Sequence, residues 1–184
     1  ALDHRCKAYP VLIPKFLKRK RAPFSREGAV FYIPKRGYSS QGKMMDPLIE
    51  RVIPVLMEFT QISACDIDAI LLVGSHARGE ARTDSDIDLV IISSQWESLL
   101  SERKWLHHFG EPLRITQENY GLLTSLRVFY TDKEIEFGLT SPQWLALPLD
   151  PGTKEVLEGG YRILYERRGY LSSLQEALPP PFST

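Results

Sequence analysis

Two aspartates at the start of an apolar segment are the first residues whose spacing suggests chemistry. Asp86 and Asp88 are two positions apart and lead into the apolar run 89–92, so on a strand their side chains project from the same face. Carboxylates held side by side repel each other unless a positive charge lies between them. A divalent cation supplies that charge, and Mg²⁺ prefers carboxylate, water and phosphate oxygens. The pair therefore predicts a magnesium site that holds one ion or two.

A third carboxylate is expected from a neighbouring strand. In the segment 134–139, apolar residues alternate with Glu134, Glu136 and Gly138, which puts the apolar residues on the core face and these three on the other. Glu136 lies in the middle of the segment and Glu134 lies beside a turn, so Glu136 is the predicted site residue. Two roles stay open for it: a metal ligand, or the base that accepts the proton of an attacking hydroxyl. The small Gly138 is expected to leave space for substrate.

A glycine and a serine mark the turn that is expected to receive phosphate. The apolar run 69–73 ends at Gly74 and Ser75, where a buried strand is expected to turn into a helix. Backbone N–H groups at such a turn and the positive end of the helix dipole both favour an anion. Arg78 lies one helical turn further on and Arg82 two, so either guanidinium can pair with phosphate oxygens.

These residues form a pattern that extends from the glycine-serine pair to the third carboxylate. Its first part is a Gly-Ser pair, ten residues and an Asp-x-Asp pair, filled here by Gly74, Ser75, Arg78, Gly79, Ser85, Asp86 and Asp88. The pattern resembles the nucleotidyltransferase superfamily, in particular its minimal and aminoglycoside-nucleotidyltransferase-like branch. The resemblance implies an α/β (α+β) polymerase-beta-like fold, in which a mixed β-sheet is flanked by helices. It also implies nucleotide binding by Gly74, Ser75, Arg78 and Ser85, although Ser85 can equally cap the turn before the strand.

The resemblance also implies an activity. A nucleoside monophosphate, AMP from ATP by family frequency, would pass from an NTP to an acceptor hydroxyl with release of pyrophosphate, and Asp86, Asp88 and Glu136 would hold the metal. Members of the superfamily adenylylate aminoglycosides, and others adenylylate a HEPN-type toxin as its antitoxin. The expected acceptor is thus a small-molecule or protein hydroxyl, and a HEPN-type toxin is a candidate partner. The alternative is a non-catalytic nucleotide-binding regulator or antitoxin. The sequence departs from the family pattern in having Glu136 where Asp is common.

The elements that must position these residues follow from apolar spacing. The continuous runs 69–73 and 87–92 are typical of strands buried on both faces, and the polar segment between them has room for one or two helical turns. Apolar residues at helical spacing predict an amphipathic helix over 97–108 that is closed by Gly110. Segments 123–130 and 134–140 are expected to pair as a hairpin.

Several further elements complete the expected domain. The start Asp46-Pro47 predicts a helix to about Thr60 with a bend at Pro54. The others are a short strand at 29–33, a short helix at 141–145, a helix at 151–157, a strand at 161–165 and a last helix before Pro179.

Charge divides the chain into two parts. Residues 1–43 carry 11 Lys/Arg against 2 Asp/Glu, whereas residues 44–184 carry 12 against 21. We therefore expect a basic N-terminal arm over 1–43 and a single nucleotidyltransferase domain over 44–184. The arm can contact nucleic acid by releasing phosphate counterions, or it is a solvated tail that precedes an alternative start at Met44-Met45.

The rest of the composition points to a soluble cytoplasmic protein. No stretch approaches the roughly 20 consecutive apolar residues of a membrane-spanning helix, so no membrane contact is expected. The basic N-terminal segment lacks the apolar run of a secretory signal. The two cysteines, Cys6 and Cys65, form neither a disulfide framework nor a zinc spacing.

Overall fold

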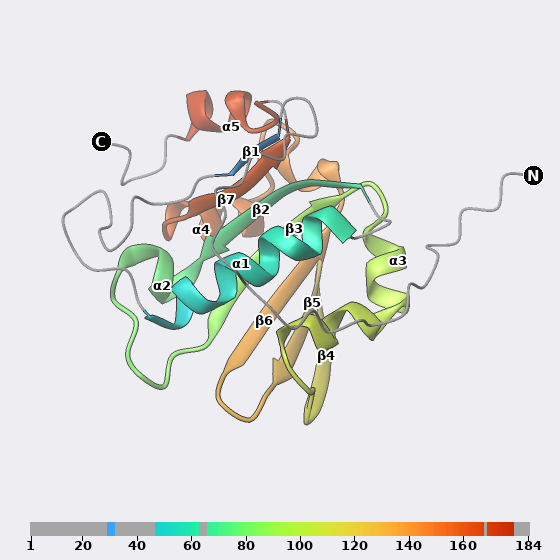
Figure 1. Cartoon of the computed structure of the whole chain (residues 1–184). Coiled ribbons are helices and arrows are strands. Elements are labelled where there is room, and N and C mark those ends of the chain that lie inside the picture. The colour runs from blue at the N-terminus through green and yellow to red at the C-terminus, as the bar shows by residue number, and fades with distance from the viewer. Residues whose placement is uncertain (1–28, 32–46, 63–65, 168, 179–184) are drawn as a thin grey trace, which may run out of the picture.

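A seven-stranded sheet forms the centre of the computed structural model, which describes residues 29–31, 47–62, 66–167 and 169–178. The strand order is β1-β7-β2-β3-β6-β5-β4 (Figure 1). The pair β3 and β6 is parallel and the other neighbouring strands are antiparallel, so the sheet is mixed as predicted. The strands are Ala29–Phe31 (β1), Ile67–Val73 (β2), Ile87–Ser93 (β3), Arg114–Tyr120 (β4), Leu123–Phe129 (β5), Glu134–Thr140 (β6) and Arg162–Arg167 (β7).

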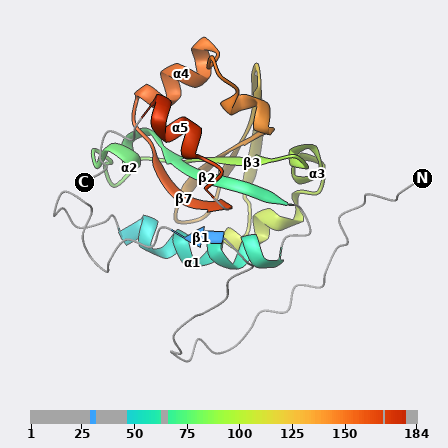
Figure 2. The same ribbon diagram turned by 90° about the horizontal axis from the view of Figure 1, so that it is seen from above.

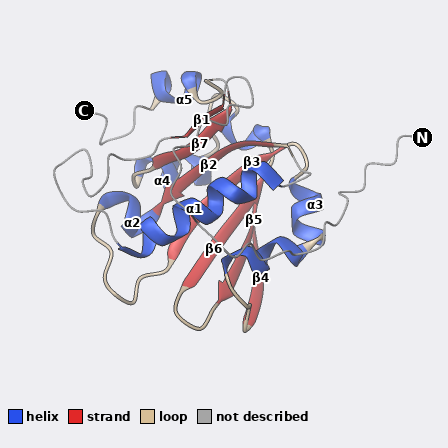
Figure 3. Ribbon diagram, viewed as in Figure 1, coloured by secondary structure: helices blue, strands red, loops and turns tan. Residues whose placement is uncertain are grey.

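Helices cover both faces of the sheet. Figure 2 shows α1 on one side of β2 and β3, and α4 and α5 on the other, and Figure 3 separates helices from strands by colour. The α-helices are Pro47–Ile62 (α1), Gly74–Arg78 (α2), Trp96–Ser101 (α3), Pro151–Glu158 (α4) and Ser172–Ala177 (α5), and the 3₁₀ helices are Arg103–Phe109 (η1) and Pro142–Leu145 (η2). This arrangement of a mixed sheet flanked by helices confirms the predicted fold class.

The two faces of the sheet bury two separate apolar clusters because neighbouring residues of a strand point to opposite faces. On β2, Ile70 and Leu72 belong to the cluster under α1, α3 and η1. Leu71 and Val73 belong to the cluster under η2, α4 and α5. Burial on both faces explains why residues 69–73 of β2 and 89–92 of β3 are all apolar.

Aromatic side chains fix β6 against the helical layer. Phe137 is fully buried and meets Trp105 edge-on, with ring centroids 4.9 Å apart. Trp105 in turn stacks on Phe59 of α1 at 5.1 Å. Such contacts add stabilisation beyond the area that they bury. They hold the core-facing side of β6 in place, and Glu136 is thereby set on the opposite face.

Most of the predicted elements are present with shifted ends. The runs 69–73 and 87–92 form β2 and β3, the short helix between them is α2, and the predicted hairpin is β5 and β6. The predicted strand at 29–33 corresponds to β1 and the strand at 161–165 to β7, and these two pair with each other. The expected helices at 141–145 and 151–157 and before Pro179 correspond to η2, α4 and α5.

The first helix, α1, extends from Pro47 to Ile62 with Pro54 inside it, so this proline does not end the helix. The predicted cap Asp46 lies outside the described residues, as do Cys6, Cys65 and most of the basic arm. None of the helices in the described part of the chain is long and apolar enough to cross a bilayer.

Two predictions of secondary structure were wrong. The single helix expected over 97–108 is divided into α3 and η1, because Glu102 leaves helical geometry with φ −97° and ψ 67°. The break lets the Trp105 indole donate a hydrogen bond of 2.8 Å to the Leu99 carbonyl. Strand β4 was missed, since its sequence is polar and most of its residues are exposed, which leaves little apolar alternation to detect.

Candidate metal and nucleotide site

Three carboxylates meet at one end of the parallel strand pair. Asp86 directly precedes β3, Asp88 lies on β3, and Glu136 lies on β6. In the parallel register Asp88 is the partner of Glu136. Each residue offers a ligand atom, and these atoms all lie within 4.8 Å of one another. The sequence predicted this convergence, and the structure brings all three residues together.

The register of β6 explains why Glu136 reaches the aspartates. Ile135, Phe137 and Leu139 are fully buried on the core face, so the alternating residues Glu134 and Glu136 project from the opposite face. Glu136 is the one beside Asp88. Carboxylate oxygens suit Mg²⁺, whose coordination shell is completed by water and phosphate oxygens. The three carboxylates therefore fit this ion.

Position 74 requires a glycine because its backbone lies close to the Asp88 carboxylate. Its φ of +67° lies in the left-handed region, which favours glycine. A Cβ atom placed on Gly74 would lie 2.1 Å from the Asp88 Oδ2 atom. Val73 and Asp88 are partners in the antiparallel pair of β2 and β3, which brings the turn and the carboxylate together. The absence of a side chain at position 74 therefore allows Asp88 to occupy its place in the site.

Asp88 carries the clearest electrostatic signature of the site. Burial, together with the neighbouring charges of Asp86 and Glu136, raises the pKa of Asp88 from 3.8 to about 7, although the charges of Arg127 and Arg78 act in the opposite direction. A carboxyl group that is costly to ionise among like charges gains from a nearby cation. This electrostatic environment favours a bound divalent ion.

Arg127 is a site residue that the sequence reasoning missed. It lies on β5 as the cross-strand partner of Glu136. Its Nη1 atom donates to Asp86 Oδ2 at 3.2 Å and to Glu134 Oε1 at 2.8 Å, and its Nη2 atom donates to Glu136 Oε2 at 2.5 Å. The predicted hairpin did not locate Arg127, because strand ends at residues 130 and 134 would set Val128 opposite Glu136, whereas in the structure Phe129 pairs with Glu134.

A buried serine completes the surroundings of Glu136. The Ser125 hydroxyl donates a hydrogen bond of 2.8 Å to Glu136 Oε1, so both oxygens of this carboxylate have partners. The expectation that Gly138 leaves space for substrate was wrong. A Cβ atom at Gly138 would lie 2.8 Å from the Leu123 Cδ1 atom, because the Leu123 side chain fills the space above this glycine.

The predicted phosphate-binding residues lie around α2, which starts directly after β2 with Gly74 and Ser75. Arg78 donates from Nε to Glu80 Oε2 at 2.8 Å and from Nη1 to the Gly159 carbonyl at 3.1 Å. These contacts tie α2 to the end of α4. The binding of nucleotide by Gly74, Ser75 and Arg78 stays a prediction.

Ser85 has a visible part in shaping the loop before Asp86. Its hydroxyl accepts a hydrogen bond of 2.9 Å from the Arg82 backbone N–H, and its own N–H donates to the Arg82 carbonyl at 3.1 Å. Both bonds close the turn that leads into β3. A role for Ser85 in binding nucleotide stays a prediction.

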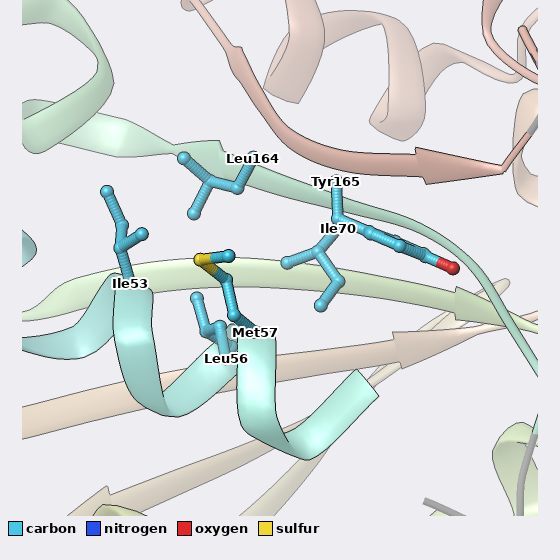
Figure 4. Close-up of a pocket in the computed structure, with 6 residues that line it drawn as sticks. All are labelled: Ile53, Leu56, Met57, Ile70, Leu164 and Tyr165. Carbon is cyan, nitrogen blue, oxygen red and sulfur yellow. The ribbon is translucent and has the colours of Figure 1, made fainter. Parts of the chain in front are cut away.

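A small apolar cavity lies on the other face of the sheet from the carboxylates. It lies between α1, β2 and β7 (Figure 4) and is lined by Ile53, Leu56, Met57, Ile70, Leu164 and Tyr165. Ile70 and Leu56 belong to the cluster under α1, whereas Asp88 alternates with residues of that cluster along β3. At about 10 Å³ the cavity is the size of one water molecule and too small for a nucleotide.

A family model matches the part of the chain that holds the acidic site. Residues 55–137 match the model of the nucleotidyltransferase domain, and this range contains Gly74, the two aspartates and Glu136. No curated protein matches the chain.

Among solved structures, the chain is similar to an aminoglycoside 6-adenyltransferase from Bacillus subtilis, with 13% identity, a TM-score of 0.40 and coverage of 54% of this chain and 36% of that one. It is also similar to the Cid1 poly(U) polymerase, with 16% identity, a TM-score of 0.32 and coverage of 50% and 29%. The chain thus spans about a third of the length of these structures. Because both TM-scores are low, the assignment rests on the family match and on the residues within it. Residues 55–137 are thus similar to the nucleotidyltransferase domain, and the three carboxylates lie inside this similarity.

Proposed function

We propose that this protein is a Mg²⁺-dependent nucleotidyltransferase that moves a nucleoside monophosphate, AMP from ATP, to an acceptor hydroxyl and releases pyrophosphate. One observation carries the proposal: Asp86, Asp88 and Glu136 offer ligand atoms within 4.8 Å of one another. They do so inside the segment that matches the nucleotidyltransferase domain. The close approach of Asp88 to Gly74 supports a site in which metal ligands and the phosphate-binding turn are adjacent.

Each residue has a defined part in this proposal. Mg²⁺, when bound, neutralises charge on the triphosphate and on the attacking and leaving oxygens. Asp86 and Asp88 hold the ion, and Glu136 either completes the ligand set or accepts the proton of the acceptor hydroxyl. In-line transfer needs little else from the protein than correct positioning and charge neutralisation.

The remaining residues act on the nucleotide. Backbone N–H groups at Gly74 and Ser75 receive the triphosphate, and Arg78, the exposed last residue of α2, offsets its negative charge. Ser85 keeps the loop before Asp86 closed through its bonds to Arg82.

The acceptor is a hydroxyl of a small molecule or of a partner protein in the cytoplasm. A HEPN-type toxin is the protein acceptor that the family resemblance suggests. Nucleic-acid contact through the basic segment 1–43 is a secondary expectation, since Lys/Arg-rich segments bind phosphate backbones without sequence preference.

The test is transfer of label from α-labelled ATP in the presence of Mg²⁺. Small-molecule hydroxyl acceptors and proteins encoded by neighbouring genes serve as acceptors. We expect Asp86→Ala and Asp88→Ala each to lower transfer by at least about a hundredfold, the size of effect seen when one charge-stabilising group is lost from an active site. The matched control is Asp132→Ala, because Asp132 lies in the turn between β5 and β6 and pairs with Arg51 instead of the cluster. If Asp86→Ala or Asp88→Ala transfers label at the wild-type rate, the assignment is refuted.

The same experiment separates catalysis from binding. A wild-type protein that binds Mg-ATP in calorimetry but labels no acceptor and releases no pyrophosphate is a nucleotide-binding regulator or antitoxin. In that case the carboxylates hold the Mg-nucleotide for association with a partner, and the two aspartate variants lose ATP binding together with partner binding.

A further inference from the structure

Arg127 lies among carboxylates that the proposed function assigns to a metal ion. Its guanidinium contacts three carboxylates, those of Asp86, Glu134 and Glu136, at distances of 2.5 to 3.2 Å. Two of these three belong to the group that can hold a cation. The guanidinium thus provides positive charge to the carboxylates that a metal ion would contact. We define the acidic cluster as Asp86, Asp88, Glu134 and Glu136.

The contacts of Glu136 show which oxygen atoms Arg127 and a divalent ion would both contact. Its Oε2 atom accepts from Arg127 and its Oε1 atom accepts from Ser125. An ion that binds Glu136 must therefore replace at least one of these donors or share an oxygen with it. Asp86 is in a similar position, since its Oδ2 atom accepts from Arg127. A guanidinium and a divalent ion close to the same oxygens repel each other.

We propose that Arg127 is an exchangeable countercation: it holds Asp86 and Glu136 together when no divalent ion is bound and yields their oxygens when the ion enters. This proposal rests on the proposed function, because it assumes that these carboxylates bind the ion. Arg127 acts through the carboxylates and is a positioning residue. Its planar fork holds five N–H donors in a fixed geometry, whereas a lysine offers three on a compact ammonium group.

Glu134 retains Arg127 during the exchange. It receives Nη1 of Arg127 at 2.8 Å, lies beside the turn at the start of β6, and is outside the group that can hold the ion. When the ion takes Asp86 and Glu136, the guanidinium keeps Glu134 as a partner.

The experiment measures Mn²⁺ binding by electron paramagnetic resonance with the full chain, after removal of metal with EDTA. We expect Arg127→Gln to bind Mn²⁺ about tenfold more tightly than the wild type, since the repulsion between two cations is gone. Without metal the same variant is expected to melt at a lower temperature, because the carboxylates lose their counter-charge. Arg127→Lys keeps the charge and is expected to bind Mn²⁺ within about threefold of the wild type.

Two further variants make the test specific. Arg114→Gln removes the same charge from the neighbouring strand β4, where Arg114 lies over the Phe129 ring at 3.9 Å, and it is expected to leave Mn²⁺ affinity unchanged. Glu134→Gln is expected to weaken Mn²⁺ binding in the wild-type background and to weaken it less in the Arg127→Gln background, because part of its effect passes through Arg127.

The outcomes distinguish this inference from the proposed function. If Arg127→Gln binds Mn²⁺ no more tightly than the wild type while the wild type does bind it, the countercation role is refuted and the metal site stands. If Mn²⁺ binds neither the wild type nor Arg127→Gln, both proposals are wrong. Binding by Arg127→Gln alone supports the exchange in its strongest form.

Discussion

Replacing Gly74 with alanine tests whether the position of Asp88 decides function. In this variant a methyl group would lie 2.1 Å from Asp88 Oδ2, whereas Cβ atoms essentially never approach other atoms within 3.0 Å. The carboxylate must therefore move by almost 1 Å. A displacement of about 1 Å at a reacting centre can cost a hundredfold in rate, and loss of a group that orients metal ligands typically costs about 10- to 100-fold in metal affinity.

A second effect of this substitution must be separated from the first. Gly74 has a φ of +67°, and an alanine in left-handed geometry costs about 1–2 kcal/mol. Gly121 offers a matched control, because its φ is +63° and a Cβ atom there meets nothing within 4 Å. Gly121→Ala thus carries the backbone cost without the contact to Asp88.

The assay compares the two variants in three measurements: thermal unfolding, Mn²⁺ affinity and label transfer from α-labelled ATP. Both variants are expected to lose similar stability, of about 1–2 kcal/mol. Only Gly74→Ala is expected to bind Mn²⁺ at least about tenfold more weakly and to lose about a hundredfold in transfer. If the two variants agree within twofold in Mn²⁺ affinity and in transfer, Asp88 is not held in a functional position by Gly74, and the geometric reasoning fails.

Three further predictions concern pH, the core and a helix cap. The raised pKa of Asp88, about 7 against 3.8, favours the protonated folded state, so this stabilisation is complete below about pH 4 and is lost as the pH rises to about 7. Because Mn²⁺ binds the ionised carboxylate, the rise in Tm that Mn²⁺ causes in melting curves should grow between about pH 4 and about pH 7. A rise in Tm that is the same at every pH contradicts the assignment. Phe137→Ala should cost about 3–5 kcal/mol in denaturant unfolding, because Phe137 is fully buried against Trp105, and a loss below 1 kcal/mol is inconsistent with this packing. Asp150→Ala should cost about 1 kcal/mol in the same assay, since Asp150 accepts from the N–H groups at the start of α4, and an unchanged stability means that the cap contributes nothing.

The acidic cluster was predictable because it depends on the simplest rule of strand geometry. Alternation of buried and exposed residues put Asp86 with Asp88, and Glu136 with Glu134, on defined faces, and the buried residues Ile135 and Phe137 confirm the alternation. Only the pairing of β3 with β6 had to be assumed. The family resemblance supplied that assumption, since the resemblance implies that the third carboxylate joins the first two.

Other features were unpredictable for identifiable reasons. The break at Glu102 leaves the apolar spacing of 97–108 unchanged, so periodicity cannot reveal it. The filling of the space above Gly138 by Leu123 depends on a diagonal contact between strands, which a residue-by-residue interpretation of one strand does not contain. Arg127 depends on the register of the hairpin, because the predicted strand ends at residues 130 and 134 would set Val128 opposite Glu136. In the structure Glu134 pairs with Phe129, and this shift of one residue sets Arg127 opposite Glu136.

The parallel pairing of β3 and β6 makes the chemistry of the site depend on the core. Asp88 and Glu136 are far apart in the sequence and become neighbours only because Leu89 is the partner of Phe137 in the same register, and both of these apolar residues are buried. A slip of one residue would turn Glu136 toward the aromatic cluster and Phe137 toward solvent, which combines the cost of burying a carboxylate with the loss of the ring contacts. The apolar contacts therefore exclude the registers in which the carboxylates would be separated. The geometry of the acidic site is maintained by residues that touch neither metal nor nucleotide.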